Sequence, residues 1–228
     1  SKTFIFYTGA SAPFFFMTTQ YATYDTELSA VNSILGSIGQ APAAALNANN
    51  PEHAFVQSLL REANIDVQNE GWHFNIEYHK PAELQSNGHI YIKNDVLRYD
   101  ICDGQSIRTQ DVVRRADSTL GGDYVAKLYN LVDHTYVFSG EILVDITSLI
   151  QFTDLPPVFQ RYVTSRAASR AAAQLVSNPE LVQLLQTQEA LTRASVMEYE
   201  TQQGDHSYMG WGHNTSYSSY QPYKALRR

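Results

Sequence analysis

Two stretches of sequence decide the fold: ELSAVNSILGSIG at residues 27–39 and GWHFNIE at residues 71–77. In the first, apolar residues at positions 28, 31, 35 and 38 fall on one stripe of a helix. Asp25 or Thr26 can cap its start, and Gly39 can end it in a left-handed conformation. The second stretch opens a region of short strand-like segments. The sequence therefore predicts helices combined with β-structure.

A second helix is predicted from Asn50-Pro51 to Gly71, because Asn is a favoured N-cap and Pro suits the first helical position. Its two apolar rows are Phe55, Leu59 and Ala63, and Val56, Leu60 and Val67. Glu62, Asp66 and Glu70 form a third, acidic row four residues apart. Like charges at this spacing repel by a few tenths of a kcal/mol. Such a row is a solvated face, a partner for basic residues, or the lining of a channel.

The region from residue 72 to 146 has the pattern of antiparallel hairpins. Short segments rich in Tyr, Val and Ile alternate with turn signals at Asn87-Gly88, Asp103-Gly104 and Gly121-Gly122. The expected strands are 72–78, 89–93, 96–102, 111–115, 127–131, 135–138 and 142–146.

Helical signals return after this region. Thr153 and Asp154 are expected to cap a third helix with prolines in its first turn, and Asn178-Pro179 starts a fourth helix that runs to about Gln202. Arg166 and Arg170 form a basic pair on the third helix. We expect this pair to face the acidic row of the second helix, within one subunit or between subunits.

The expected fold class is α+β, an antiparallel helical bundle of about four long helices with an inserted antiparallel β subdomain and an extended C-terminal arm. The expected divisions are an N-terminal extension (1–24), a helical domain (25–71 and 153–203), a β-rich subdomain (72–152) and the arm (204–228). The N-terminal extension is apolar but too short and interrupted to span a bilayer, so no membrane contact is expected. It either packs against a neighbour, which we favour, or is mobile.

The C-terminal arm lacks periodicity and cannot bury a core by itself. Because its aromatic side chains are costly to leave in water, we expect it to order on a partner, with plain disorder as the alternative. The candidate contact residues are Tyr208, Trp211, Tyr217, Tyr220, Tyr223, Arg227 and Arg228.

Composition points toward contact with other proteins rather than with nucleic acid. Only 17% of residues are charged, while tyrosines number 15 and phenylalanines 10. Aromatic residues accumulate at protein interfaces, although a β-rich core with a tyrosine-rich tail would give the same counts. A net charge of −7 argues against a basic face that grips DNA phosphates.

Few residue patterns suggest chemistry. His73, Asn75, Glu77 and His79 share one face of the expected strand and could bind a metal, but a polar outer face is the favoured interpretation. Glu198 and Glu200 are too close in a helix to face each other and fit a solvated helix end. The single cysteine, Cys102, rules out an intrachain disulfide and is expected to be a buried strand residue. No catalytic, cofactor-binding or metal site is predicted.

From residue 17 to about 208 the chain resembles the tail tubular protein A family, the adaptors of short-tailed bacteriophages. The resemblance rests on residues 27–39 and 71–77, on LPP at 155–157 followed by RYVTSRA at 161–167, and on MEYE at 197–200.

The resemblance implies a structural virion protein rather than an enzyme. Twelve copies would form a ring between the capsid portal and the tail nozzle, with tail fibres attached around it and DNA passing through without specific binding. Such a protein is assembled in the cytoplasm of the bacterial host and resides in the virion tail. A virion-associated glycan-degrading hydrolase remains the alternative, because its two carboxylates could come from distant positions.

Overall fold

The computed structural model describes residues 25–47, 49–101, 111–140, 142–176 and 178–203. These residues form four α-helices and two small antiparallel sheets, which confirms the α+β class. The helices are α1 (Glu27–Ser37), α2 (Pro51–Asn69), α3 (Pro157–Leu175) and α4 (Pro179–Gln203). The helix α1 has 11 residues and ends just before Gly39, which at φ +79° takes the left-handed conformation that the sequence predicts.

Three of the four helices start at the caps that the sequence predicts. The side chains of Thr26, Asn50 and Asn178 accept hydrogen bonds from backbone N–H groups in the first turns of α1, α2 and α4. The predicted cap of α3 is wrong, since Thr153 and Asp154 lie in a separate 3₁₀ turn, η1 (Phe152–Asp154). A residue before proline avoids the helical region, so α3 starts only at Pro157.

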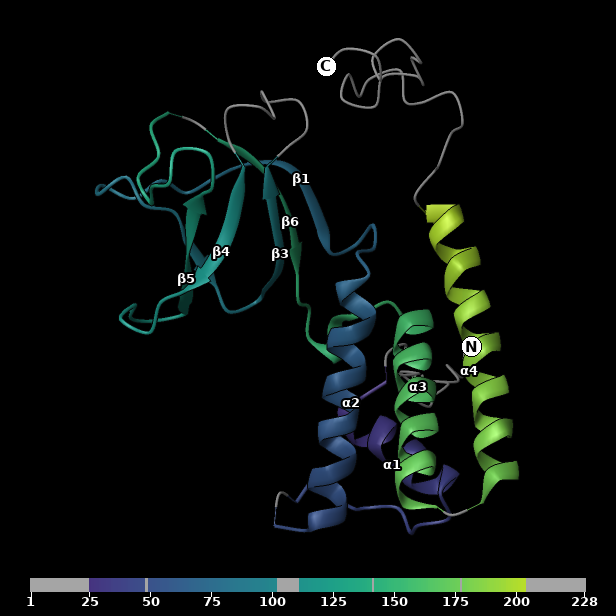
Figure 1. Cartoon of the computed structure of the whole chain (residues 1–228). Helices are drawn as coiled ribbons and strands as arrows, with labels where there is room; N and C mark the ends of the chain where they lie inside the picture. Colours follow the sequence, from purple (N-terminus) through teal and green to yellow (C-terminus); the bar gives the residue numbers. More distant parts are fainter. Residues whose placement is uncertain (1–24, 48, 102–110, 141, 177, 204–228) are drawn as a thin grey trace, which may run out of the picture.

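In Figure 1, α2, α3 and α4 lie side by side with α3 in the middle, and α1 lies behind them, in contact with α2 and α3. We call these four helices the helical part. Its core comes almost wholly from α1, α2 and α3 and includes Val31, Ile34, Leu35, Val56, Leu60, Val67, Phe159, Tyr162, Val163 and Ala167. In α4 only Leu185 and Val196 are buried. None of the described helices is long and apolar enough to cross a lipid bilayer.

The β part, residues 76–148, lies beyond the C-terminal end of α2 (Figure 1). One sheet has the order β1 (Ile76–Pro81), β6 (Leu143–Ser148), β3 (Val96–Ile101). The other has the order β2 (Tyr91–Lys93), β5 (Tyr124–Asn130), β4 (Val112–Ala116). Both sheets contribute to one core, formed by Ile90, Ile92, Ala126, Leu128, Phe138, Ile142, Val144 and Ile146.

Two predicted strands are corrected. Residues 135–138 form no strand, because the Asn130 side chain accepts backbone N–H groups of a tight turn and Thr135 makes only an isolated bridge. The strand predicted from residue 72 begins at Ile76, since Asn75 Oδ1 accepts the N–H of Trp72 at 2.8 Å and holds a turn there. Trp72 consequently belongs to the helical core. Cys102 lies outside the described residues.

Buried amides join the two parts where the chain crosses between them. Gln68 of α2 donates to the carbonyl of Ile150 at 2.7 Å and accepts its N–H at 2.7 Å. The Asn75 side chain donates to the Gln68 carbonyl at 2.9 Å, and the Asn75 backbone carbonyl accepts the N–H of Ser148 at 2.8 Å. Because a buried amide is costly to leave unpaired, these bonds fix the β part at the end of α2.

Candidate interaction site on the helices

A charged network lies where α2, α3 and α4 meet, around the hydroxyl of Tyr162. The Tyr162 side chain is only 1% exposed. Its hydroxyl accepts a hydrogen bond from Arg166 Nη1 at 3.0 Å and another from Arg193 Nη1 at 2.8 Å. Arg166 follows Tyr162 by one helical turn, whereas Arg193 reaches the same oxygen from α4. The hydroxyl therefore joins α3 to α4.

These two arginines, together with Arg170, also bind the acidic row of α2. Arg193 holds Glu70 with both ends of its guanidinium group, at 2.9 and 3.0 Å, which is the strong two-pronged geometry. The hydrogen bonds to Glu70 and, to a smaller extent, the hydrogen bond to Tyr162 raise the pKa of Arg193 above its ordinary range. Arg170 pairs with Asp66, and Arg166 lies 3.9 Å from Asp66 and 3.8 Å from Glu70. Five charged side chains and the Tyr162 hydroxyl thus connect three helices.

The contact expected between Arg166 and Arg170 and the acidic row is therefore present within one chain. It involves Asp66 and Glu70 but not Glu62, which has no ion-pair partner among the described residues. Sequence reasoning missed Arg193. A usable signal exists, because Arg193 is the only basic residue in the 25 residues of α4.

The seven C-terminal candidates lie outside the described residues: Tyr208, Trp211, Tyr217, Tyr220, Tyr223, Arg227 and Arg228.

A second polar contact fixes the C-terminal end of α4. Glu200 accepts the backbone N–H of His73 at 2.9 Å, and His73 Nδ1 lies 2.5 Å from the second Glu200 oxygen. Beneath this pair, Phe159 contacts the rings of Trp72 and Phe74 at centroid distances of 5.0 and 4.6 Å. The end of α4 is therefore attached to the turn before β1.

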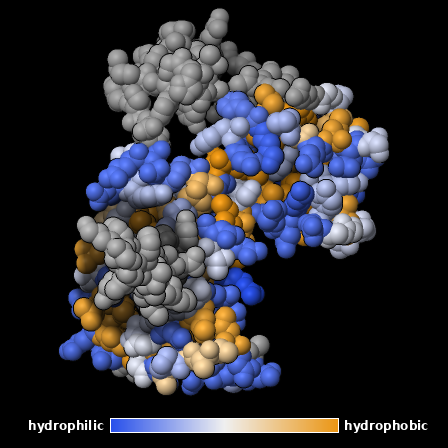
Figure 2. Space-filling view, turned by 180° about the vertical axis from the view of Figure 1, so that it is seen from behind, coloured by the Kyte–Doolittle hydropathy of each residue, from blue (hydrophilic) through white to orange (hydrophobic). Residues whose placement is uncertain are grey.

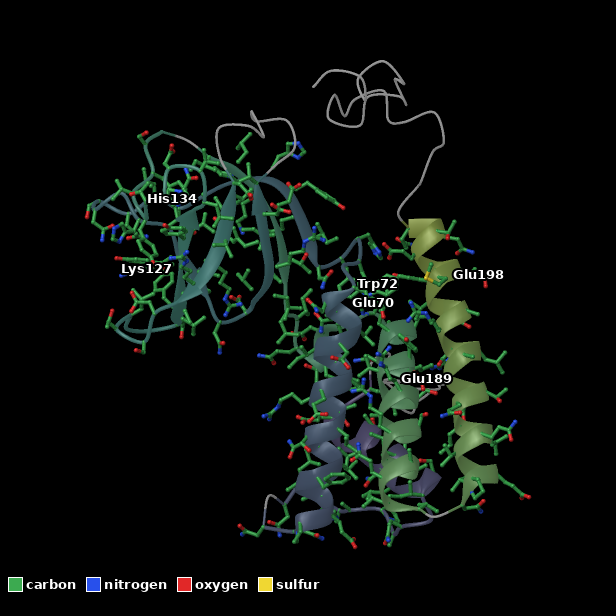
Figure 3. The ribbon with its side chains drawn as sticks, in the orientation of Figure 1. Glu70, Trp72, Lys127, His134, Glu189 and Glu198 are labelled. Atoms are coloured by element: carbon green, nitrogen blue, oxygen red, sulfur yellow. The ribbon has the colours of Figure 1, made fainter. Side chains whose placement is uncertain are left out.

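These contacts overturn two expectations. Glu200 is not at a solvated helix end; its side chain is half-buried against His73, while Glu198 lies on the exposed side of α4 (Figure 3). The shared face of His73, Asn75, Glu77 and His79 does not exist. His73 precedes the strand, Asn75 is buried, and His79 has φ +57° beside a register shift in β1. Within the described part of the chain, no three potential metal ligands come together.

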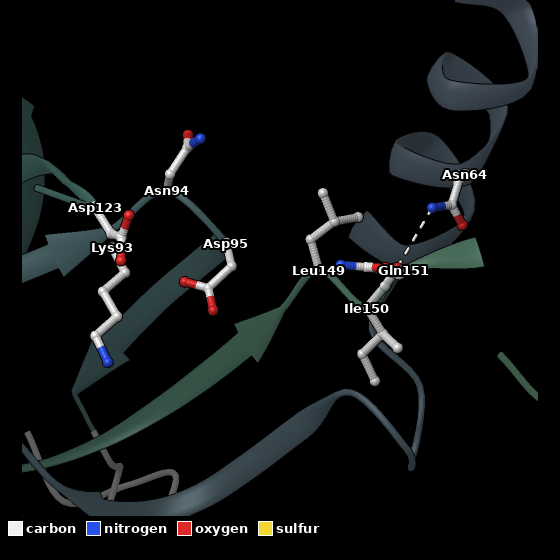
Figure 4. Close-up of a pocket in the computed structure, with 8 residues that line it drawn as sticks. All are labelled: Asn64, Lys93, Asn94, Asp95, Asp123, Leu149, Ile150 and Gln151. Carbon is white, nitrogen blue, oxygen red and sulfur yellow. Dashed lines mark hydrogen bonds between the residues drawn. The ribbon is translucent and has the colours of Figure 1, made fainter. Parts of the chain in front are cut away.

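An open pocket of about 580 Å³ lies between α2 and the β part (Figure 4). It is lined by Asn64, Lys93, Asn94, Asp95, Asp123, Leu149, Ile150 and Gln151. Its two carboxylates, Asp95 and Asp123, belong to exposed residues. The acid that donates a proton in glycoside hydrolysis needs a secluded, largely apolar setting, which this pocket does not provide.

Comparison with known protein families identifies a relationship. A family model described as "tail tubular protein" matches residues 28–206. A search of curated proteins found no match. The matched range starts in α1, contains every residue of the charged network and the His73–Glu200 pair, and ends just beyond α4.

Proposed function

The chain belongs to the tail tubular protein family, whose members are structural parts of phage tails, and we propose that it is the ring-forming adaptor of a short tail. In this role it joins the capsid portal to the tail nozzle and forms part of the channel through which DNA is ejected. The family match over residues 28–206 carries the proposal.

The arrangement of the chain supports this role. The helical domain (25–71 and 153–203) would build the ring wall from about twelve copies, and the β-rich subdomain (72–152) would point toward nozzle and fibres. The amides around Gln68 support such a division, because they hold the β part in one position relative to α2. The arm at 204–228, with the aromatic residues named above, would contact the portal or an adjacent subunit.

In the proposed ring the charged network has an internal role. The ion pairs of Arg166 and Arg170 hold α3 against α2, and that of Arg193 holds α4 at the end of α2, so these arginines are not free to bridge two subunits. Glu62, which has no ion-pair partner among the described residues, remains available to a neighbouring copy. The net charge of −7 per chain favours passage of DNA over retention, because like charges repel it.

The proposal is tested with the full-length chain, the portal and the nozzle protein of the same phage. Mass measurement should show a large ring that forms in the presence of portal and then retains the nozzle. A chain that binds neither protein, stays monomeric, and cleaves a polysaccharide would contradict it. Loss of that cleavage in Asp95→Asn or Asp123→Asn would identify the open pocket as the site of a hydrolase.

A further inference from the structure

The most exposed large apolar residues of the described chain lie on α4. Leu184 is 65% exposed and Leu191 is 66% exposed. They are seven residues apart, and because each residue turns a helix by about 100°, they lie on the same side of α4. Seen from behind, the helical part shows apolar side chains at its surface (Figure 2). Two leucines two turns apart form a ready contact stripe.

The surface around these leucines carries little charge. From Leu181 to Met197, the only charged residues are Glu189 and Arg193. Arg193 is bound to Glu70 and Tyr162 on the side of α4 that faces α2 and α3. Interfaces between identical chains are more apolar than the rest of the surface and are depleted in charged residues at their centre. The leucine stripe has this composition.

A complementary groove lies at the turn between α3 and α4. It is an open hollow of about 590 Å³, lined by Ala173, Val176, Asn178, Pro179, Val182, Gln183 and Gln186. Val182 precedes Leu184 by two residues, which places it about 160° around the helix from Leu184. The leucine stripe and the groove therefore face opposite directions from the same helix.

We propose that Leu184 and Leu191 of one copy pack into the groove formed by Ala173, Val176 and Val182 of the next copy. This inference rests on the proposed function, because a ring repeats one contact between identical chains. Two different complementary surfaces on opposite sides of a chain give a head-to-tail contact, which closes into a ring or continues as a filament. A contact of leucine stripe with leucine stripe would instead stop at a dimer.

The first test compares self-association of the full-length chain by sedimentation velocity over a range of concentrations. The L184S/L191S variant should associate more weakly, by about tenfold for each leucine removed from the contact. The matched control is V132S/V137S, which alters two apolar residues of the β part that are 46% and 54% exposed. The control should associate as the wild type does, and circular dichroism should show an unchanged unfolding midpoint for both variants.

The second test distinguishes the head-to-tail contact from a symmetric one. A173E/V182E alters the groove and leaves the leucines intact. Each double variant alone should be monomeric, whereas an equal mixture should form complexes of two chains and nothing larger, because one intact stripe meets one intact groove. Dimers formed by A173E/V182E alone would overturn the proposal in favour of stripe-to-stripe pairing, and a mixture that stays monomeric would overturn it outright.

Three further results would overturn it: association of L184S/L191S equal to that of the wild type, a loss as large in V132S/V137S, or a wild-type chain that stays monomeric at all concentrations and also forms no ring with portal. If the wild-type chain associates only after removal of residues 1–24, the chain's own N-terminal segment covers the leucines and the proposal also fails. Portal binding separates this inference from the proposed function. A portal-dependent ring that forms equally well from L184S/L191S would refute the contact and leave the adaptor role intact.

Discussion

The helices α3 and α4 follow one another in sequence but are held in different ways. In α3, nine of 19 residues are buried, whereas in α4 two of 25 are. Alanines on several sides of α3 let its neighbours approach closely, and its aromatic residues fill the space at its N-terminal end. In α4, Leu185 and Val196 face the chain's own core, and polar contacts through Arg193 and Glu200 supply the rest.

This difference in burial shows that the surface of α4, rather than that of α3, is available to contact another chain. Packing within the chain determines the position of α3, since burial of large apolar side chains is the dominant stabilising contribution. The position of α4 depends on two buried residues, Leu185 and Val196, and on polar contacts that stay partly exposed to water. Apolar side chains left over on such a helix are the natural place for another chain to bind.

The largest expected effect is in α3. Phe159→Ala removes a fully buried ring that contacts Trp72, Phe74 and Tyr199, and should lower the free energy of unfolding by about 3–5 kcal/mol. Urea unfolding followed by circular dichroism measures this loss. The matched change in α4, Leu185→Ala, should cost about 2 kcal/mol, near the lower end for a buried leucine. Equal losses would mean that α4 is as firmly packed as α3.

A smaller effect is expected from reversing the charges that α3 directs at α2. R166E/R170E removes the pairs with Asp66 and Glu70 and places like charges beside them, for a loss of about 1–3 kcal/mol. Arg161→Glu is the control, because Arg161 is exposed on α3 and has no ion pair among the described residues. A comparable loss in the control would show that the ion pairs add no stability and that the loss comes only from the change in net charge.

Much of this architecture could be predicted from local signals. The caps at Thr26, Asn50 and Asn178 and the two apolar rows of α2 are determined by neighbouring residues, so they could be read from sequence. The acidic row and the Arg166–Arg170 pair could also be predicted from the sequence, since residues four positions apart lie on the same face of a helix.

The contacts that could not be predicted join residues far apart in sequence. Glu200 binds His73 across 127 positions, and Arg193 binds Glu70 across 123. Neither spacing leaves a local pattern. The alternation of aromatic and polar residues after Gly71 is typical of a strand. Here the alternate aromatic side chains, Trp72 and Phe74, instead pack against the helical core from a turn. The turn was set by a single amide, that of Asn75.

Removal of Arg193 tests how α4 is held. Arg193→Ala should cost only about 1 kcal/mol in global unfolding, because the ion pair is partly exposed. Locally the effect should be larger: hydrogen exchange should become faster along α4 and stay unchanged in the buried part of α3. High salt should produce a weaker version of the same change in the wild type, since exposed pairs are screened. Equal acceleration in both helices would show that α3 and α4 open as one unit.

The smallest effect is expected at the end of the acidic row that lacks a partner. Glu62→Gln should change the free energy of unfolding by less than about 0.5 kcal/mol, and any change should be a gain, because it removes repulsion from Asp66 one turn away. Asp66→Asn, which breaks the pair with Arg170, should be destabilising under the same conditions. Opposite signs for two carboxylates on one helix face would show that the row is divided between α3 and solvent. If Glu62→Gln instead weakens assembly while leaving monomer stability unchanged, then Glu62 contacts a neighbouring copy. The outer face of α2 would then be a second surface, besides α4, that binds another chain.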